Sequence, residues 1–171
     1  STAEVERIVK KVGACIVWGG TNLGLVPADS KLIQVEKQLN IDPEAQLLSS
    51  IMAKKIAAGS NYILIHIPYG KSTKVNKAKA LRLKKKFEYI GRYFHKKLIC
   101  VLTPNTGPTG NGIGPALEMI DVLKVLKRED ACYQLEKLSL ELSGKIFELV
   151  GKAKKGKGFE MAKQILDSGK A

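Results

Sequence analysis

The sequence predicts an α/β protein in which helices flank a parallel sheet, together with a small helical lobe segment. Short apolar runs typical of buried strands alternate with longer stretches whose apolar residues recur at helical spacing. This alternation favours parallel strands joined by helices. With 171 residues, of which 44% are hydrophobic, the chain can bury one core, or one core and a small lobe.

The first third of the chain is expected to be mostly helical. Apolar residues at helical spacing predict helices over 3–12 and 28–39. Between them, a short apolar run over 14–18 is typical of a buried strand, and 19–27 is a glycine-rich loop. A third helix is expected over 42–58, with a glycine directly after it.

The rest of the chain continues the alternation and ends in helices. The expected elements, in order, are a buried strand over 62–67, a helix over 74–95, a strand over 98–102, a Gly- and Pro-rich loop over 103–114, a helix opened by Pro115, and two or three helices over 131–168. Together they predict a sheet with helices on its faces.

The segment over 40–55, NIDPEAQLLSSIMAKK, is the most informative local pattern. Asp42 has the properties of a helix cap, with a proline at the expected first helical position. Ser50 and Lys54 are four residues apart, so they share one helical face. An acid at a helix start with a hydroxyl and an amine on one face suits a small-ligand site. A capped amphipathic helix with a solvated lysine accounts for the same pattern.

Resemblance to a known family adds to this pattern. The chain resembles the nucleoside phosphorylase family that contains thymidine phosphorylase, and is most similar to its archaeal branch of AMP phosphorylases. The matching segments are spread from end to end: GACIVWGGTNLGLVPADSKLI (13–33), IDPEAQLLSSIMAKKIAAGS (41–60), LIHIPYGKSTKV (64–75), GNGIGPALEMIDVLKVL (110–126) and ILDSGKA (165–171).

The resemblance implies an enzyme with a helical lobe and an α/β lobe, and an active site between them. It places about 26–58 in the helical lobe, and 1–25 and 59–171 in the α/β lobe. The family's phosphate-binding loop, a KHS-type motif, does not occur in this sequence. We therefore expect residues 1–171 to be a central fragment that carries the base side of the site and is inactive by itself.

The implied reaction is phosphorolysis, in which orthophosphate displaces the base from a nucleoside or nucleotide and yields a sugar 1-phosphate. By residue-to-residue resemblance, Asp42 matches the proton donor of the AMP branch. Ser50 and Lys54 match residues that hold the base, and Lys74 matches a lysine implied in nucleotide binding. No cofactor is expected, since orthophosphate is a co-substrate.

One departure from the family pattern bears on the substrate. Pyrimidine-specific members carry an arginine about fifteen positions before the serine, where this chain has Val35. A valine cannot make the bidentate contact of an arginine. The sequence therefore favours a nucleoside 5′-monophosphate, AMP with CMP and UMP as further candidates, over thymidine. A thymidine phosphorylase is the alternative.

The formal charge of +13 is the strongest compositional anomaly, and lysines are densest over 71–86. They could form a solvated face, steer a phosphorylated substrate, or bind nucleic acid. Leu83, Phe87, Ile90 and Phe94 are expected to form the buried stripe of this helix. No aromatic residue is then expected among the exposed lysines, which disfavours a stacking platform for nucleic acid. A non-catalytic RNA- or protein-binding module is the second alternative.

The remaining features concern the compartment and metals. The three cysteines, Cys15, Cys100 and Cys132, are expected to be reduced thiols of a cytoplasmic protein. No apolar run approaches the roughly 20 residues of a membrane span, and no leader pattern occurs. No metal-ligand spacing is present. Glu118, after a glycine-rich turn that could bind an anion, is a candidate ligand for a monovalent cation by resemblance to some bacterial relatives. The full-length protein is expected to be a homo-oligomer.

Overall fold

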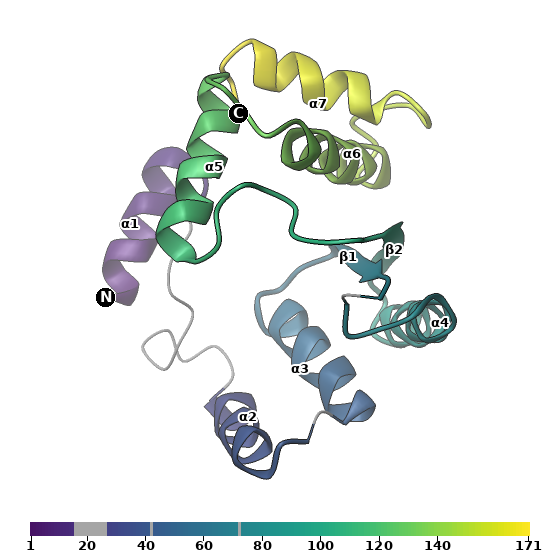
Figure 1. Cartoon of the computed structure of the whole chain (residues 1–171). Coiled ribbons are helices and arrows are strands. Elements are labelled where there is room, and N and C mark those ends of the chain that lie inside the picture. Colours follow the sequence, from purple (N-terminus) through teal and green to yellow (C-terminus); the bar gives the residue numbers. More distant parts are fainter. Residues whose placement is uncertain (16–26, 42, 72) are drawn as a thin grey trace. The chain divides into compact units, whose positions relative to one another are not determined.

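The computed structural model describes residues 1–15, 27–41, 43–71 and 73–171 (Figure 1). In these ranges the chain forms seven helices and a two-stranded parallel sheet, so the expected α/β class is confirmed. Backbone contacts divide it into two compact units, Ser1–Ser60 and Asn61–Ala171. The assignment of residues to the two lobes of the related enzymes stays a prediction.

The first unit contains three helices, α1 (Thr2–Val12), α2 (Pro27–Leu39) and α3 (Glu44–Ala57). A capping box begins α1, since the Ser1 side chain accepts from the backbone N–H of Glu4 and the Glu4 side chain accepts from Ser1. Pro27 is the first residue of α2, where its fixed φ suits a helix start. The strand expected over 14–18 lies mostly outside the described residues.

The start of α3 differs from the expected one by one position. Pro43 occupies the capping position, with ψ of 131°, and Glu44 is the first helical residue. The extended ψ at Pro43 keeps it out of the helix, although its φ of −67° would be compatible with one. Asp42, the expected cap, lies outside the described part of the chain. Leu48 and Met52 form the buried stripe of α3.

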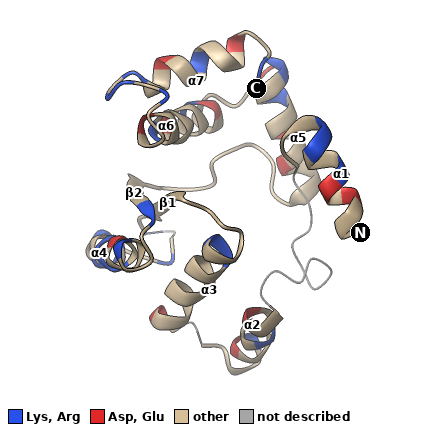
Figure 2. Ribbon diagram, turned by 180° about the vertical axis from the view of Figure 1, so that it is seen from behind, with Lys and Arg blue, Asp and Glu red and all other residues tan. Residues whose placement is uncertain are grey.

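The second unit is built on a strand–helix–strand element. β1 (Tyr62–Tyr69) and β2 (Lys97–Pro104) pair in parallel, with Tyr62 opposite Lys97 and Tyr69 opposite Pro104, and α4 (Lys77–Tyr93) connects them. The two strands lie between α4 and α6 in both ribbon views (Figures 1 and 2). Both strands confirm the sequence-based prediction. The helix begins later than expected, because Asn76 caps it by accepting from the backbone N–H of Lys79 at 2.9 Å.

Three helices complete the second unit: α5 (Pro115–Lys127), α6 (Tyr133–Leu149) and α7 (Gly158–Asp167). Their shared core consists of Val125, Leu140, Ala162 and Leu166. Arg128 reinforces this packing electrostatically, since its guanidinium lies 2.6 Å from Glu136 and 3.2 Å from Asp167. The expected helical end of the chain is confirmed, with two helices after residue 131.

The backbones of α6 and of the start of α7 approach each other closely. A Cβ added to Gly144 would lie 2.6 Å from the Gly158 carbonyl carbon and 2.6 Å from the Phe159 nitrogen. Backbone atoms at that distance cannot move aside as a flexible side chain can. The pair Gly144 and Gly158 therefore sets how tightly α7 packs against α6.

We expect Gly144→Ala to lower the free energy of unfolding of the chain by about 1–3 kcal/mol, the usual effect of overpacking. This loss should outweigh the roughly 1 kcal/mol that alanine contributes to helix propensity. The matched control is Ser143→Ala at the neighbouring exposed position of α6, expected to stay within about 0.5 kcal/mol of the wild type. Denaturant unfolding followed by circular dichroism measures both. An unchanged or raised stability of Gly144→Ala would contradict the packing described here.

Candidate functional site

Ser50 and Lys54, two of the residues predicted to bind the base, lie together on one face of α3. Both contact Asp29 of α2. The Lys54 Nζ lies 2.5 Å and the Ser50 Oγ 2.9 Å from the same carboxylate oxygen, Oδ2. The Lys54 Nζ also lies 2.7 Å from the Ser50 Oγ. The three groups therefore form a closed triangle of hydrogen bonds between two helices.

The other carboxylate oxygen of Asp29 is also satisfied. Gln46, one turn before Ser50 on α3, donates from its Nε2 to Oδ1 at 3.2 Å. Gln46 is itself held by Ser49, whose hydroxyl donates to the Gln46 Oε1 at 3.2 Å. Asp29 thus accepts from three side chains of a single helix, which fixes the rotation of α3 relative to α2.

Burial differs sharply between the two charged partners. Only 7% of the Asp29 side chain is exposed, whereas 41% of the Lys54 side chain is. The Asp29 carboxylate is therefore shielded from solvent, whereas the Lys54 side chain is partly accessible. Part of Lys54 and the half-buried Ser50 can meet a ligand, while Asp29 is covered by α3.

Two opposing effects act on the pKa of Asp29. Burial raises the pKa, because it disfavours the charged form. The hydrogen bonds from Lys54 and Ser50 and the charge of Lys54 lower it, and together they prevail, so the net pKa lies below its ordinary value. Asp29 is therefore a carboxylate at neutral pH and can only accept hydrogen bonds.

The other two predicted residues are not brought into this triangle by the described structure. Asp42 lies outside the described residues. Lys74 belongs to the second unit, exposed on the loop between β1 and α4. The Thr73 hydroxyl shapes this loop by donating to the Val75 carbonyl at 2.8 Å. The assignment of Asp42 and Lys74 to the site stays a prediction.

Asp29 itself was missed by sequence reasoning. An acid in the first turn of a helix is favoured by the helix dipole alone, so its presence did not call for a partner. Its contact with Lys54 spans 25 residues and follows no helical or strand period. The available signal was that Asp29 lies within the family-like segment LVPADS, which also opens α2.

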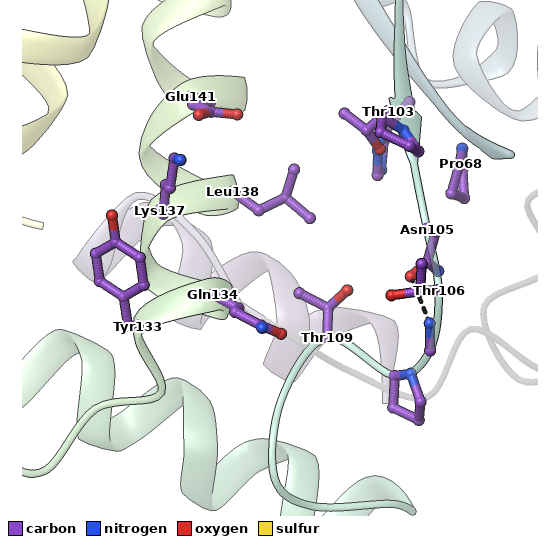
Figure 3. A pocket seen from close by; sticks show the side chains of 14 residues that line it. Pro68, Thr103, Asn105, Thr106, Thr109, Tyr133, Gln134, Lys137, Leu138 and Glu141 are labelled. Atoms are coloured by element: carbon purple, nitrogen blue, oxygen red, sulfur yellow. Dashed lines mark hydrogen bonds between the residues drawn. The ribbon is translucent and has the colours of Figure 1, made fainter. Parts of the chain in front are cut away.

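A second candidate site lies wholly within the second unit, at the carboxyl ends of β1 and β2 (Figure 3). It is a pocket of about 650 Å³ between the loop after β2 and the first turns of α6. In Figure 3, Thr109 of the loop and Gln134 of α6 face each other across it. At its strand side, the His66 Nε2 lies 2.7 Å from the Thr103 Oγ1. Burial lowers the pKa of His66, so the ring is neutral at physiological pH.

The glycine-rich turn before α5 does not offer the open anion site that the sequence suggested. The backbone N–H groups of Asn111 and Gly112 donate to the Asp121 Oδ2 at 2.7 and 2.8 Å. The N–H of Gly114 donates to the Glu118 Oε1 at 3.1 Å. The protein's own carboxylates therefore occupy the donors that an anion would need. Within the described ranges, no group of three metal-ligating residues is found.

The basic helix α4 differs from expectation at its end. Leu83 and Phe87 are buried as predicted, but Phe94 is 44% exposed because it lies beyond the last helical residue. Tyr89 and Tyr93 are 64% and 69% exposed on the same helix. Figure 2 shows the many Lys and Arg residues that α4 carries. Both tyrosines follow the lysine-rich run over 71–86 and do not lie within it. The expectation that no aromatic side chain interleaves with the lysines of that run stays a prediction.

The cysteines of the described ranges carry no disulfide. Cys15, Cys100 and Cys132 are free thiols, and burial, followed by the charge of Glu88, raises the pKa of Cys100 to about 11. In the part of the chain that the structure describes, every helix is too short or too polar to pass through a lipid bilayer.

Comparison with known proteins gives consistent matches. No protein-family model matches the chain. It is 46% identical over its whole length to a "Putative thymidine phosphorylase" of Ralstonia nicotianae. It is 45% identical, over 98% of its length, to an "AMP phosphorylase" of Methanococcus maripaludis, and 44% identical to a "Putative thymidine phosphorylase" of Bradyrhizobium diazoefficiens. The chain spans about a third of the length of each of these relatives: 34%, 34% and 33%.

The triangle around Asp29 predicts a pH-dependent contribution to stability. Because the folded pKa of Asp29 lies below the unfolded value near 3.8, the contribution is fully present above that value and is lost as the pH falls through the folded pKa. We expect Asp29→Asn to lower the free energy of unfolding by about 1–3 kcal/mol at pH 7, the usual loss for hydrogen bonds to a charged group. The difference should shrink steadily below about pH 4.

The control is Asp130→Asn, because Asp130 is 97% exposed and its only described ion pair is a 3.5 Å contact with Lys124. That variant should change the stability by less than about 0.5 kcal/mol. Unfolding curves between pH 3 and pH 7 compare the two variants with the wild type, over a range that brackets the ordinary carboxyl pKa of about 3.9. A difference for Asp29→Asn that is the same at both ends would contradict an ionised, paired Asp29.

Proposed function

The chain belongs to the nucleoside phosphorylase family that contains thymidine phosphorylase and AMP phosphorylase, and we propose that it carries the base-binding side of an AMP phosphorylase. The proposed reaction of the full-length protein is phosphorolysis of a nucleoside 5′-monophosphate. AMP is the preferred substrate, and CMP and UMP are further ones. The products are the free base and ribose 1,5-bisphosphate. The observation that carries the proposal is the pairing of Ser50 and Lys54 on one face of α3 above a buried carboxylate.

The chemistry sets what the site has to supply. An oxygen of orthophosphate attacks the anomeric carbon, and the glycosidic bond breaks with its electron pair going to the base. A base leaves poorly as an anion, so a proton donor or a cation beside it lowers the barrier. In our proposal Asp42 gives a proton to a ring nitrogen. Ser50 and Lys54 orient the base, and the charge of Lys54 also favours its departure.

Lys74 is the proposed contact for the 5′-phosphate. It is exposed on the loop after β1, and the preceding Lys71 is exposed as well. Ammonium groups bind phosphate oxygens through short charge-assisted hydrogen bonds. A lysine that binds the phosphate would distinguish a nucleotide from a nucleoside and leave the reaction at the sugar unchanged.

Val35 supports AMP over thymidine. It lies on α2, the helix that supplies Asp29, and is 51% exposed. An aliphatic side chain there cannot donate hydrogen bonds to a base carbonyl, as the arginine of pyrimidine-specific relatives does. Thymidine phosphorylase remains the alternative, since two of the relatives above carry that name. A cytoplasmic location and a homo-oligomeric assembly of the whole protein stay predictions.

The full-length protein should release base from AMP in a phosphate-dependent reaction, and faster than from thymidine. The measurement is a chromatographic assay of free base with AMP, CMP, UMP and thymidine, each with and without orthophosphate. Equal or better turnover of thymidine would overturn the preference for nucleotides. If none of the four compounds releases base in a phosphate-dependent way, the catalytic proposal fails. The alternative of a non-catalytic binding module is then favoured.

Two substitutions in the full-length enzyme should separate the proposed roles. Asp42→Asn removes the proton but keeps the size, so we expect kcat to fall by roughly 10²–10⁴-fold with KM nearly unchanged. Lys74→Ala should raise KM for AMP and matter little for a nucleoside. Lys77→Ala, at an exposed position on α4, is the matched control for a lost lysine charge. Near-normal kcat in Asp42→Asn would mean that another group is the acid.

A further inference from the structure

The triangle around Asp29 fixes the direction of each of its hydrogen bonds. A carboxylate only accepts and an ammonium group only donates. The hydroxyl of Ser50 lies 2.9 Å from the Asp29 Oδ2, so its single proton must point at the carboxylate. Lys54 lies 2.7 Å from the same hydroxyl and must donate to it. The chemistry of the three groups leaves no second arrangement.

What remains for a ligand follows from counting donors and acceptors. The Ser50 Oγ has one proton and two lone pairs. The proton is used on Asp29 and one lone pair on Lys54, so one acceptor position is left. Lys54 has three N–H groups, of which two are used on Asp29 and the Ser50 hydroxyl. The third has a contact of 3.4 Å with the Ser50 carbonyl, longer than the usual range, so it can turn to a ligand.

We propose that Asp29 sets the hydrogen-bond polarity of the base site, so that Ser50 serves only as an acceptor and Lys54 only as a donor. This inference rests on the proposed function. The ligand edge that fits has an N–H donor next to an acceptor. Adenine offers its amino group beside N1, cytosine its amino group beside N3, and uracil its N3–H beside a carbonyl. A purine that lacks the amino group has no hydrogen-bond donor for the Ser50 oxygen.

Asp29 is in this sense a positioning residue, because α3 covers it and it acts through Ser50 and Lys54. Replacement of Asp29 by asparagine removes the negative charge of the carboxylate. It also introduces an N–H₂ group that can donate to Ser50. The serine hydroxyl is then free to turn its own proton toward the ligand. A purely structural ion pair between α2 and α3 would predict no such change in base discrimination.

The test uses the full-length protein and two substrates, AMP and purine riboside 5′-monophosphate, which differ only by the 6-amino group. In the wild type we expect kcat/KM to favour AMP by about 10–100-fold, since the analogue leaves the Ser50 acceptor unpaired. In Asp29→Asn we expect this ratio to fall at least about threefold, because the serine hydroxyl is no longer held as an acceptor toward the amino group. Thermal unfolding of each variant verifies that it is folded at the assay temperature.

Two further variants keep the test decisive. Ser50→Ala retains the pair of Asp29 and Lys54 but removes the acceptor, so the preference for AMP should be lost there too. If Asp29→Asn does not fold, this variant still tests whether Ser50 is the acceptor that the inference requires. Ser143→Ala is the matched control, because Ser143 is an exposed serine of α6 outside the network around Asp29, and its AMP preference should equal that of the wild type.

The outcomes test the proposed function and the inference about Asp29 separately. If the wild type releases no base from AMP, the proposed function fails. If the wild type is active but does not distinguish the two substrates, the assigned polarity of Ser50 is wrong. A folded Asp29→Asn or Ser50→Ala that keeps the wild-type preference also overturns the inference, even though the enzyme is an AMP phosphorylase.

Discussion

A single buried carboxylate, that of Asp29, determines how the described part of the first unit can meet a ligand. It joins α2 to α3 and holds Ser50 and Lys54 in one arrangement. It is only 7% exposed, so removing it from water is costly unless its partners satisfy it fully. Gln46 completes that satisfaction on the other oxygen. The same contacts therefore stabilise two helices and orient the groups that a base would meet.

In the second unit, carboxylates also accept hydrogen bonds from nearby donors. At the turn before α5, however, these bonds use the donors that a ligand would need. Asp121 and Glu118 accept the backbone N–H groups of the glycine-rich turn before α5. That turn is closed by the protein itself, whereas the triangle around Asp29 still has one donor and one acceptor to give. The difference is chemical, because a backbone N–H has one proton to donate while a lysine has three.

Features that depend on local spacing could be predicted from the sequence. The strands β1 and β2 follow from their apolar runs, and the shared face of Ser50 and Lys54 follows from their separation of four residues. Asp29 could not be predicted, because its contact with Lys54 spans 25 residues without any period. The burial expected for Phe94 was wrong because the apolar period of α4 was extended beyond the last helical residue.

A crystal structure of the full-length protein with adenine bound would examine the role of Asp29 most directly. We expect Asp29 to contact both Ser50 and Lys54 in that complex, as it does in the structure described here. The adenine amino group should then lie within ~3.2 Å of the Ser50 Oγ, and N1 within ~3.2 Å of the Lys54 Nζ. Adenine bound away from these two side chains, or Lys54 turned away from Asp29 when the base is present, would contradict this role of Asp29.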